Sequence, residues 1–179
     1  MVAGGWHPLH MVAILRPMPH RQPFTVARAN AMVPWLESVF ARLDGNRVAW
    51  TRHFEGVQIL EVLWGEGLRS GANPDHAEFL EHRRGMEAAG QAISQIVERD
   101  ILGRGLRFPS GGLENGIVDF PTTFEGRWVY LCWQRGEPQV SYWHELGSGF
   151  RGRQDVAAEH VIAMGQDDGE PPDDAVLGP

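Results

Sequence analysis

Apolar residues recur at steps of three and four along two long stretches of the chain, which is the pattern of amphipathic helices. In the first stretch they are Leu36, Phe40, Leu43, Trp50, Phe54, Val57 and Trp64, with Arg47 and Glu61 filling the gaps. In the second stretch the same spacing links Phe79, His82, Met86, Ala89, Ile93 and Ile96. A glycine-rich segment at residues 65–71 separates the two, so the pattern predicts a long antiparallel helical hairpin over residues 25–103, packed along a lengthwise seam.

Polar and proline residues indicate where these helices begin. Thr25 is an expected N-cap, and Pro34 predicts a short first turn and a kink before the longer helix. Asn73 followed by Pro74 is typical of an N-cap with proline at the first helical position. We expect the second helix to end near Gly103.

Strand patterns follow the hairpin. Residues 116–120 predict a short strand that Pro121 stops, and residues 127–134 alternate with apolar residues on both faces, as in a covered strand. Residues 135–138 predict a turn that returns the chain as a strand over residues 139–145. The predicted fold class is therefore α+β: the helical hairpin together with a small antiparallel sheet of about three strands.

The length of 179 residues indicates a single domain. We assign it to residues 24–164, made of the hairpin at 25–103, a β-rich module at 104–153 and a short helix at 156–164. Residues 1–23 are expected to be a loose N-terminal extension, in which Met11 or Met18 is an alternative start. Residues 165–179, which are acidic and rich in proline, are expected to form a disordered tail.

Composition narrows the function classes. The formal net charge is −7 and the chain has no lysine, which disfavours binding to nucleic-acid backbones. No apolar run approaches the roughly 20 residues of a membrane span. The single cysteine, Cys132, excludes an internal disulfide and fits a reducing compartment, so we expect a cytoplasmic location.

Several short motifs coincide in the C-terminal half: Gly-Ile-Val-Asp-Phe-Pro at 116–121, Leu-Cys-Trp at 131–133, Gly-Glu-Pro at 136–138 and Tyr-Trp-His-Glu at 142–145. With the segment that begins at Phe24-Thr25, they resemble a bacterial family catalogued as domain of unknown function 2203, some members of which carry a DivIVA label. The resemblance covers residues 24–153. Family members have acidic residues where this chain has Arg28 and Ser148, so those two positions are not expected to be essential here. The resemblance supports the boundaries of the fold and implies no activity.

Asp119, His144 and Glu145 are the residue types that bind a divalent metal or move protons near neutral pH. On a strand, His144 and Glu145 point to opposite faces, so they share a site only if the strand ends or bulges there. In the alternative interpretation His144 bonds a backbone carbonyl and Glu145 pairs with Arg151 or Arg153. These two arginines are also candidates for binding an anion.

Cys132 lies between Leu131 and Trp133, and nothing near it in the sequence lowers the pKa of its thiol, so a buried apolar role is expected. On the helices, His82 with Glu78 and a carboxylate such as Glu61 is a further conceivable metal site. A polar residue at a seam position more often marks register.

Two function classes remain open. In the first, the protein is a self-associating interaction or assembly module, a homo-oligomer in which Trp50 and Trp64 cover apolar flanks of the hairpin. In the alternative, it is a metal- or small-molecule-binding enzyme, hydrolytic in one version, with its site around Asp119, His144 and Glu145. The sequence does not identify a ligand, and it leaves open whether the chain is an enzyme.

Overall fold

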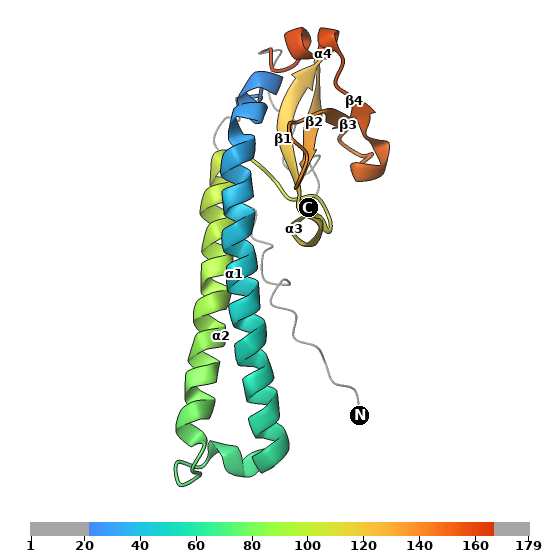
Figure 1. The fold of residues 1–179 in the computed structure, drawn as a ribbon. Coiled ribbons are helices and arrows are strands. Elements are labelled where there is room, and N and C mark those ends of the chain that lie inside the picture. The colour runs from blue at the N-terminus through green and yellow to red at the C-terminus, as the bar shows by residue number, and fades with distance from the viewer. Residues whose placement is uncertain (1–21, 167–179) are drawn as a thin grey trace. The chain divides into compact units, whose positions relative to one another are not determined.

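Two long helices and a small sheet are the main elements of the computed structural model, which describes residues 22–166 (Figure 1). The helices are α1 (Val26–Trp64) and α2 (His76–Ile96), joined through a short 3-10 turn at Gly65–Arg69. The α+β class with a helical hairpin and a small antiparallel sheet is confirmed. The expected extension (1–23) and tail (165–179) lie outside the described residues, apart from 22–23 and 165–166.

The described chain separates into two compact units, one of residues 41–97 and one of residues 22–40 with 98–166. The first unit is the part of the hairpin that contains the connection between the helices. Its apolar cluster joins Val57 and Leu60 of α1 to Leu68 and Phe79, with Met86 packed against them. Whether residues 24–164 fold as one domain stays a prediction.

The predicted seam is wrong toward the end of α1. Phe54 and Trp64 are 37% and 42% exposed, and Glu61 is also exposed, whereas Val57 and Leu60 are buried. An α-helix has 3.6 residues per turn, so a strict seven-residue repeat drifts by about 20° per heptad around its surface. The buried face therefore moves off the extrapolated positions by the time α1 ends.

The helix ends follow side-chain chemistry. Thr25 caps α1, since its Oγ1 accepts the backbone N–H of Arg28 at 3.1 Å. Pro34 lies inside α1, and no separate first turn forms before it. The helix α2 begins at His76 rather than Pro74, because the Asn73 side chain accepts the N–H of Asp75 at 2.8 Å and closes a turn there.

The helical path continues beyond α2 in altered geometry. A π turn at Val97–Ile101 follows α2, and a 3-10 turn at Leu102–Arg104 ends the path where Gly105 adopts a left-handed conformation (φ 78°). The helical stretch thus ends close to the predicted Gly103.

The sheet has the order β1-β2-β3-β4 and is antiparallel throughout. Its strands are β1 (Ile117–Phe124), β2 (Arg127–Gln134), β3 (Tyr142–Glu145) and β4 (Gln154–Asp155), and a single-turn helix, α3 (Gly112–Asn115), precedes them. The strand predicted to stop at Pro121 continues to Phe124. β1 is an edge strand, so the missing N–H of Pro121 faces away from the ladder, and its carbonyl accepts the N–H of Phe24 at 2.8 Å.

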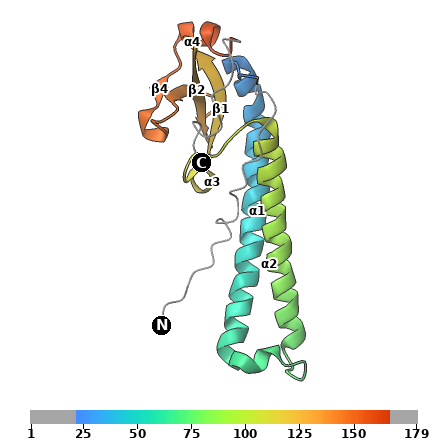
Figure 2. The same cartoon turned by 180° about the vertical axis from the view of Figure 1, so that it is seen from behind.

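One face of the sheet is covered by aromatic contacts. The ring of Phe24 contacts that of Phe120, and Phe40, in the first half of α1, contacts Trp133 at 6.1 Å between ring centroids. The short helix α4 (Ala158–Ala163) lies beside the sheet in both views (Figures 1 and 2). The ring of its His160 contacts those of Phe124 and Trp143. The opposite face carries the polar residues of the candidate site.

Gly56 on α1 and Gly85 on α2 are sites of close helix approach, and they generate a test of the packing. A Cβ at Gly56 would overlap the ring of His82, whereas a Cβ at Gly45 would meet nothing within 4 Å. We expect Gly56→Ala to lower the free energy of unfolding by about 1–3 kcal/mol, as overpacking does. Gly45→Ala, the control on the same helix, should raise it by about 0.5–1 kcal/mol. Urea denaturation followed by circular dichroism measures both, and equal effects of the two substitutions would contradict the packing.

Candidate functional site

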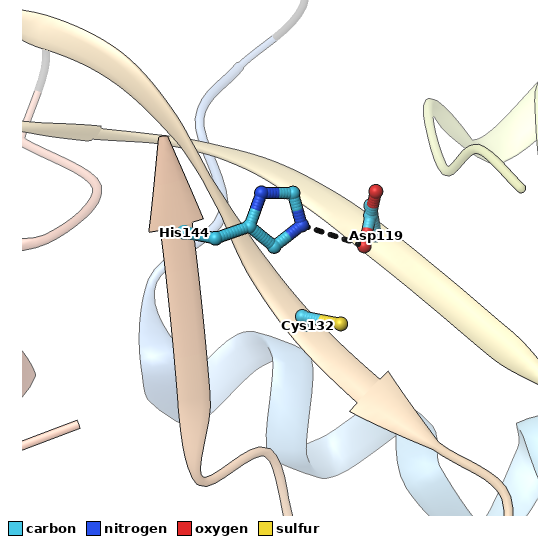
Figure 3. A group of neighbouring side chains, drawn as sticks. All are labelled: Asp119, Cys132 and His144. Atoms are coloured by element: carbon cyan, nitrogen blue, oxygen red, sulfur yellow. Dashed lines mark hydrogen bonds and ion pairs between the residues drawn. The ribbon is translucent and has the colours of Figure 1, made fainter. Parts of the chain in front are cut away.

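Three ionisable or metal-ligating side chains meet on one face of the sheet. They are Asp119 from β1, Cys132 from β2 and His144 from β3, and each is completely buried (Figure 3). Asp119 lies directly opposite Cys132. His144 lies opposite Tyr130, which is two residues from Cys132 on β2 and on the same face. Paired residues of adjacent strands point to the same face, so the register alone brings the three together.

A two-residue turn fixes that register. β1 and β2 are joined by Glu125 and Gly126, which both have positive φ (50° and 73°), as a type I′ hairpin turn requires. Counting back from this turn places Asp119 against Cys132. A slip of one residue would move both side chains to the other face.

The imidazole of His144 is held at both nitrogens. Its Nδ1 lies 2.8 Å from the backbone carbonyl of Glu145, and its Nε2 lies 3.3 Å from Oδ1 of Asp119. A carbonyl oxygen only accepts, so Nδ1 carries a proton and donates it. Attraction between Nε2 and Oδ1 then requires a second proton, or a cation, between these two atoms.

The second oxygen of Asp119 faces an arginine. Oδ2 lies 3.3 Å from Nε of Arg107, and the backbones of these two residues also exchange hydrogen bonds at 3.0 and 3.1 Å. The same guanidinium donates to the hydroxyl of Tyr130 at 3.1 Å. Because an unpaired buried carboxylate is very costly, Arg107 and His144 together make the burial of Asp119 possible.

The protonated thiol of Cys132 is a poor nucleophile. Burial raises the pKa of this thiol well above its ordinary value, and the nearby charge of Asp119 raises it further, while Arg153 opposes the shift. A thiolate nucleophile needs the opposite environment. The predicted burial of Cys132 is confirmed, and the arrangement does not support nucleophilic catalysis by this residue in the absence of a metal.

The three side chains nevertheless form a coherent donor set. One ligand atom from each residue can be chosen so that all lie within 4.8 Å of one another, giving one nitrogen, one oxygen and one sulfur. Cysteine, histidine and aspartate together are a ligand set typical of zinc and related ions. The hydrogen bond from Nδ1 of His144 to a carbonyl is also how metal-bound histidines are usually oriented.

The structure separates the other candidate residues from this group. Glu145 points away from it and pairs with Arg127 at 3.0 Å, instead of with Arg151 or Arg153. The guanidinium of Arg153 is held by the carboxylate of Glu137 at 2.8 Å, so the chain itself already supplies the anion there. Arg151 is exposed on the surface.

Sequence reasoning missed Cys132 and Arg107 as members of this group. The signal for Cys132 was the Glu125-Gly126 pair, because a two-residue turn predicts the cross-strand partner of Asp119. Arg107 gave no comparable signal, since it lies in a loop-like segment that pairs with β1 through an isolated bridge.

The chain matches a known family over residues 22–156, described as an uncharacterized conserved protein family, DUF2203. The chain belongs to this family. No curated protein and no solved structure matches it. None of the helices among residues 22–166 combines the length and apolar character needed to cross a membrane.

The raised pKa of Cys132 predicts a specific pH dependence for the metal-free protein. The unfolded thiol ionises near pH 8.5 while the folded thiol stays protonated, so stability is fully present below that pH and is lost above it, by about 1.4 kcal/mol per pH unit. The absence of lysine leaves few other groups that titrate there. Urea denaturation between pH 8 and 9.5 in the presence of a chelator should show this decline in wild type and a shallower one in Cys132→Ala. Parallel slopes would contradict the assignment.

Proposed function

We propose that this chain is a metal-binding protein, in which Asp119, Cys132 and His144 hold a divalent ion of the zinc class. The observation that carries the proposal is the convergence of these three completely buried side chains on one face of the sheet. The ion would tie three neighbouring strands together at their centre. A reducing compartment such as the cytoplasm would keep the thiol available as a ligand.

Distances in the group support this assignment. Two ligands about 2.05 Å from a tetrahedral zinc ion lie about 3.3 Å apart, and Nε2 of His144 lies 3.3 Å from Oδ1 of Asp119. In a tetrahedral zinc site, sulfur lies about 3.6 Å from a nitrogen or oxygen ligand. The ligand atoms of the group lie up to 4.8 Å apart, so the sulfur of Cys132 would have to move inward by about 1 Å to bind the ion.

The protons of the group define what an ion would replace. One proton sits on the Cys132 thiol, and one lies between Nε2 of His144 and Oδ1 of Asp119. A divalent ion at the centre displaces both, which keeps the net charge of the group unchanged. Arg107 holds the second oxygen of Asp119 and so fixes the orientation of the carboxylate.

Burial of the three side chains bears on whether the proposed ion would be structural or catalytic. All three side chains have no exposed surface, so a substrate reaches the ion only if the covering segments move. Catalytic zinc sites keep an open position for water or substrate. The geometry therefore favours a structural ion over a hydrolytic one.

Metal content tests this proposal. We expect the purified protein to bind one equivalent of cobalt(II) at this group, with a near-ultraviolet absorption band from the thiolate–cobalt bond. Asp119→Asn and His144→Ala should weaken binding by more than the roughly 10- to 100-fold that loss of an outer partner costs. Absorption spectroscopy with equilibrium dialysis measures both effects.

Glu145→Gln is the matched control, because Glu145 is the neighbour of His144 but pairs with Arg127 outside the group. It should bind cobalt as wild type does. A wild-type protein that takes up cobalt without a band sensitive to Cys132→Ser would overturn the proposal. The wild-type spectrum decides the matter even if a ligand variant fails to fold.

A second candidate function, self-association, is favoured by an apolar ridge near the end of α1. Ile59, Val62 and Leu63 are 61%, 86% and 66% exposed and are spaced as neighbours on one helix face, where with Gln58 they border a shallow, open depression. Identical ridges on two antiparallel helices can interdigitate about a two-fold axis. The partner proposed to cover this ridge is therefore a second copy of this chain.

The two tryptophans proposed for self-association have different surroundings. Trp50 stacks on Phe54 within α1, with the ring centroids 5.0 Å apart. Trp64 is 42% exposed and follows the ridge in sequence, while its indole N–H donates to Asp75 at 2.7 Å. Trp64 is therefore the better candidate to extend the ridge.

Light scattering after size-exclusion chromatography tests self-association. We expect a dimer whose dissociation constant rises at least about tenfold in Leu63→Glu, since a charge on the ridge is desolvated at the interface. Val48→Glu is the control, because Val48 is 69% exposed on the same helix but lies outside the ridge. A wild-type monomer at all concentrations, or equal effects of the two substitutions, would reject this function.

A further inference from the structure

A second pair of histidines joins the two helices of the hairpin. His53 of α1 and His82 of α2 each begin the same short pattern, histidine followed three residues later by glycine. A Cβ at Gly56 would overlap the ring of His82, and a Cβ at Gly85 would overlap the ring of His53. Each histidine thus packs on the glycine of the opposite helix, and this reciprocal contact fixes both rings.

The two rings face each other through the same kind of atom. Nδ1 of His53 lies 3.1 Å from Nδ1 of His82, with the ring centroids 5.4 Å apart and the ring planes 64° from parallel. Two lone pairs would repel at this distance, and so would two N–H groups. The contact is therefore attractive only with one proton, or one cation, between the two nitrogens.

A carboxylate lies near the second ring nitrogen of His82, Nε2. Oε1 of Glu78, one helical turn earlier on α2, lies 3.6 Å from Nε2 of His82. This contact favours the tautomer of His82 that carries its N–H on Nε2, in which Nδ1 offers a lone pair. Metal-bound histidines commonly give their second N–H to a carboxylate in this way.

We propose that His53 and His82 bind a divalent transition-metal cation that prefers imidazole, such as zinc, nickel or cobalt. The ion takes the place of the proton between the two Nδ1 atoms. With metal–nitrogen distances of about 2.05 Å, a nitrogen–nitrogen separation of 3.1 Å gives an angle of about 98° at the metal. That angle suits two neighbouring ligands of a distorted tetrahedral or an octahedral ion.

The surroundings supply the remaining requirements. The His82 side chain is 22% exposed and Glu78 is 61% exposed, so water can reach the ion and complete its coordination. The sequence suggested Glu61 as a further ligand, but Glu61 is exposed and bonded to Gln58 at 3.3 Å. The partner of His82 is instead a histidine from the opposite helix.

The ion would connect residues 29 positions apart and so cross-link α1 to α2. An ion that binds the folded hairpin and not the unfolded chain raises the melting temperature as its concentration rises. This site uses two nitrogens and no sulfur, so it is chemically distinct from the group at Asp119, Cys132 and His144.

Metal titration of the full-length chain, produced without a polyhistidine tag, tests the proposal. We expect nickel(II) to raise the melting temperature of wild type and a chelator to reverse the rise. The rise that remains in Cys132→Ser, which removes the sulfur of the sheet site, should be lost when His53→Asn or His82→Asn is added. Glu78→Gln should weaken nickel binding by about 10- to 100-fold, as loss of an outer partner does.

Two control variants give the experiment its specificity. His160→Asn removes a histidine of the sheet unit, and Glu61→Gln removes the carboxylate that the sequence suggested; both should respond to nickel as wild type does. A nickel response that persists when His53→Asn or His82→Asn is combined with Cys132→Ser would overturn the proposal, as would the absence of any response in wild type. Glu78→Gln keeps the test decisive if a histidine variant does not fold.

Cobalt(II) separates this site from the one proposed for the sheet. Binding here gives d–d absorption without a thiolate band and survives Cys132→Ser, whereas the band of the sheet site is lost in that variant. Either site can therefore fail while the other stands.

Discussion

Burial of the Asp119 carboxylate is the constraint on which the sheet depends. An isolated carboxylate in an apolar interior costs far more than the net stability of a domain this size. Arg107 reaches one oxygen from the outer side of β1, and His144 reaches the other from β3. These contacts exist only when the segment at Arg107 and the three strands hold their observed register. The charges are therefore balanced only in the completed fold, which ties the chemistry of the group to the topology of the sheet.

Much of the fold follows from local patterns in the sequence. The steps of three and four give the two helices, and Thr25 caps the first as expected. The predicted seam is wrong at Phe54 and Trp64 because a seven-residue repeat is an approximation that fails along a helix as long as α1. The sequence predicts that the strand ends at Pro121. The strand continues because Pro121 lies on the edge of the sheet, where it leaves the ladder intact, and edge position is a tertiary property.

The candidate site was only partly readable from sequence. Asp119 and His144 stand out by residue type, but Glu145, which is adjacent to His144, belongs to the other face of β3. The neighbours of Cys132 along the chain, Leu131 and Trp133, predict only its burial. The chemistry of its thiol depends on its neighbours across the strands. The register of β1 and β2 determines which residues lie opposite each other, and the two-residue turn at Glu125 and Gly126 sets that register.

In both histidine groups, at His144 and at His53 with His82, one ring nitrogen of a histidine faces an oxygen atom. The other faces an atom that repels it unless a proton or a cation lies between the two. In the sheet the acceptor is the carbonyl of Glu145 at 2.8 Å, and in the hairpin its counterpart is the more distant carboxylate of Glu78 at 3.6 Å. A proton and a metal ion serve the same electrostatic purpose in both places. They differ in what surrounds them: the sheet offers sulfur and no access to water, which favours a thiophilic ion that exchanges slowly. The hairpin offers two imidazoles near solvent, where a bound ion would exchange readily and its occupancy would follow its free concentration.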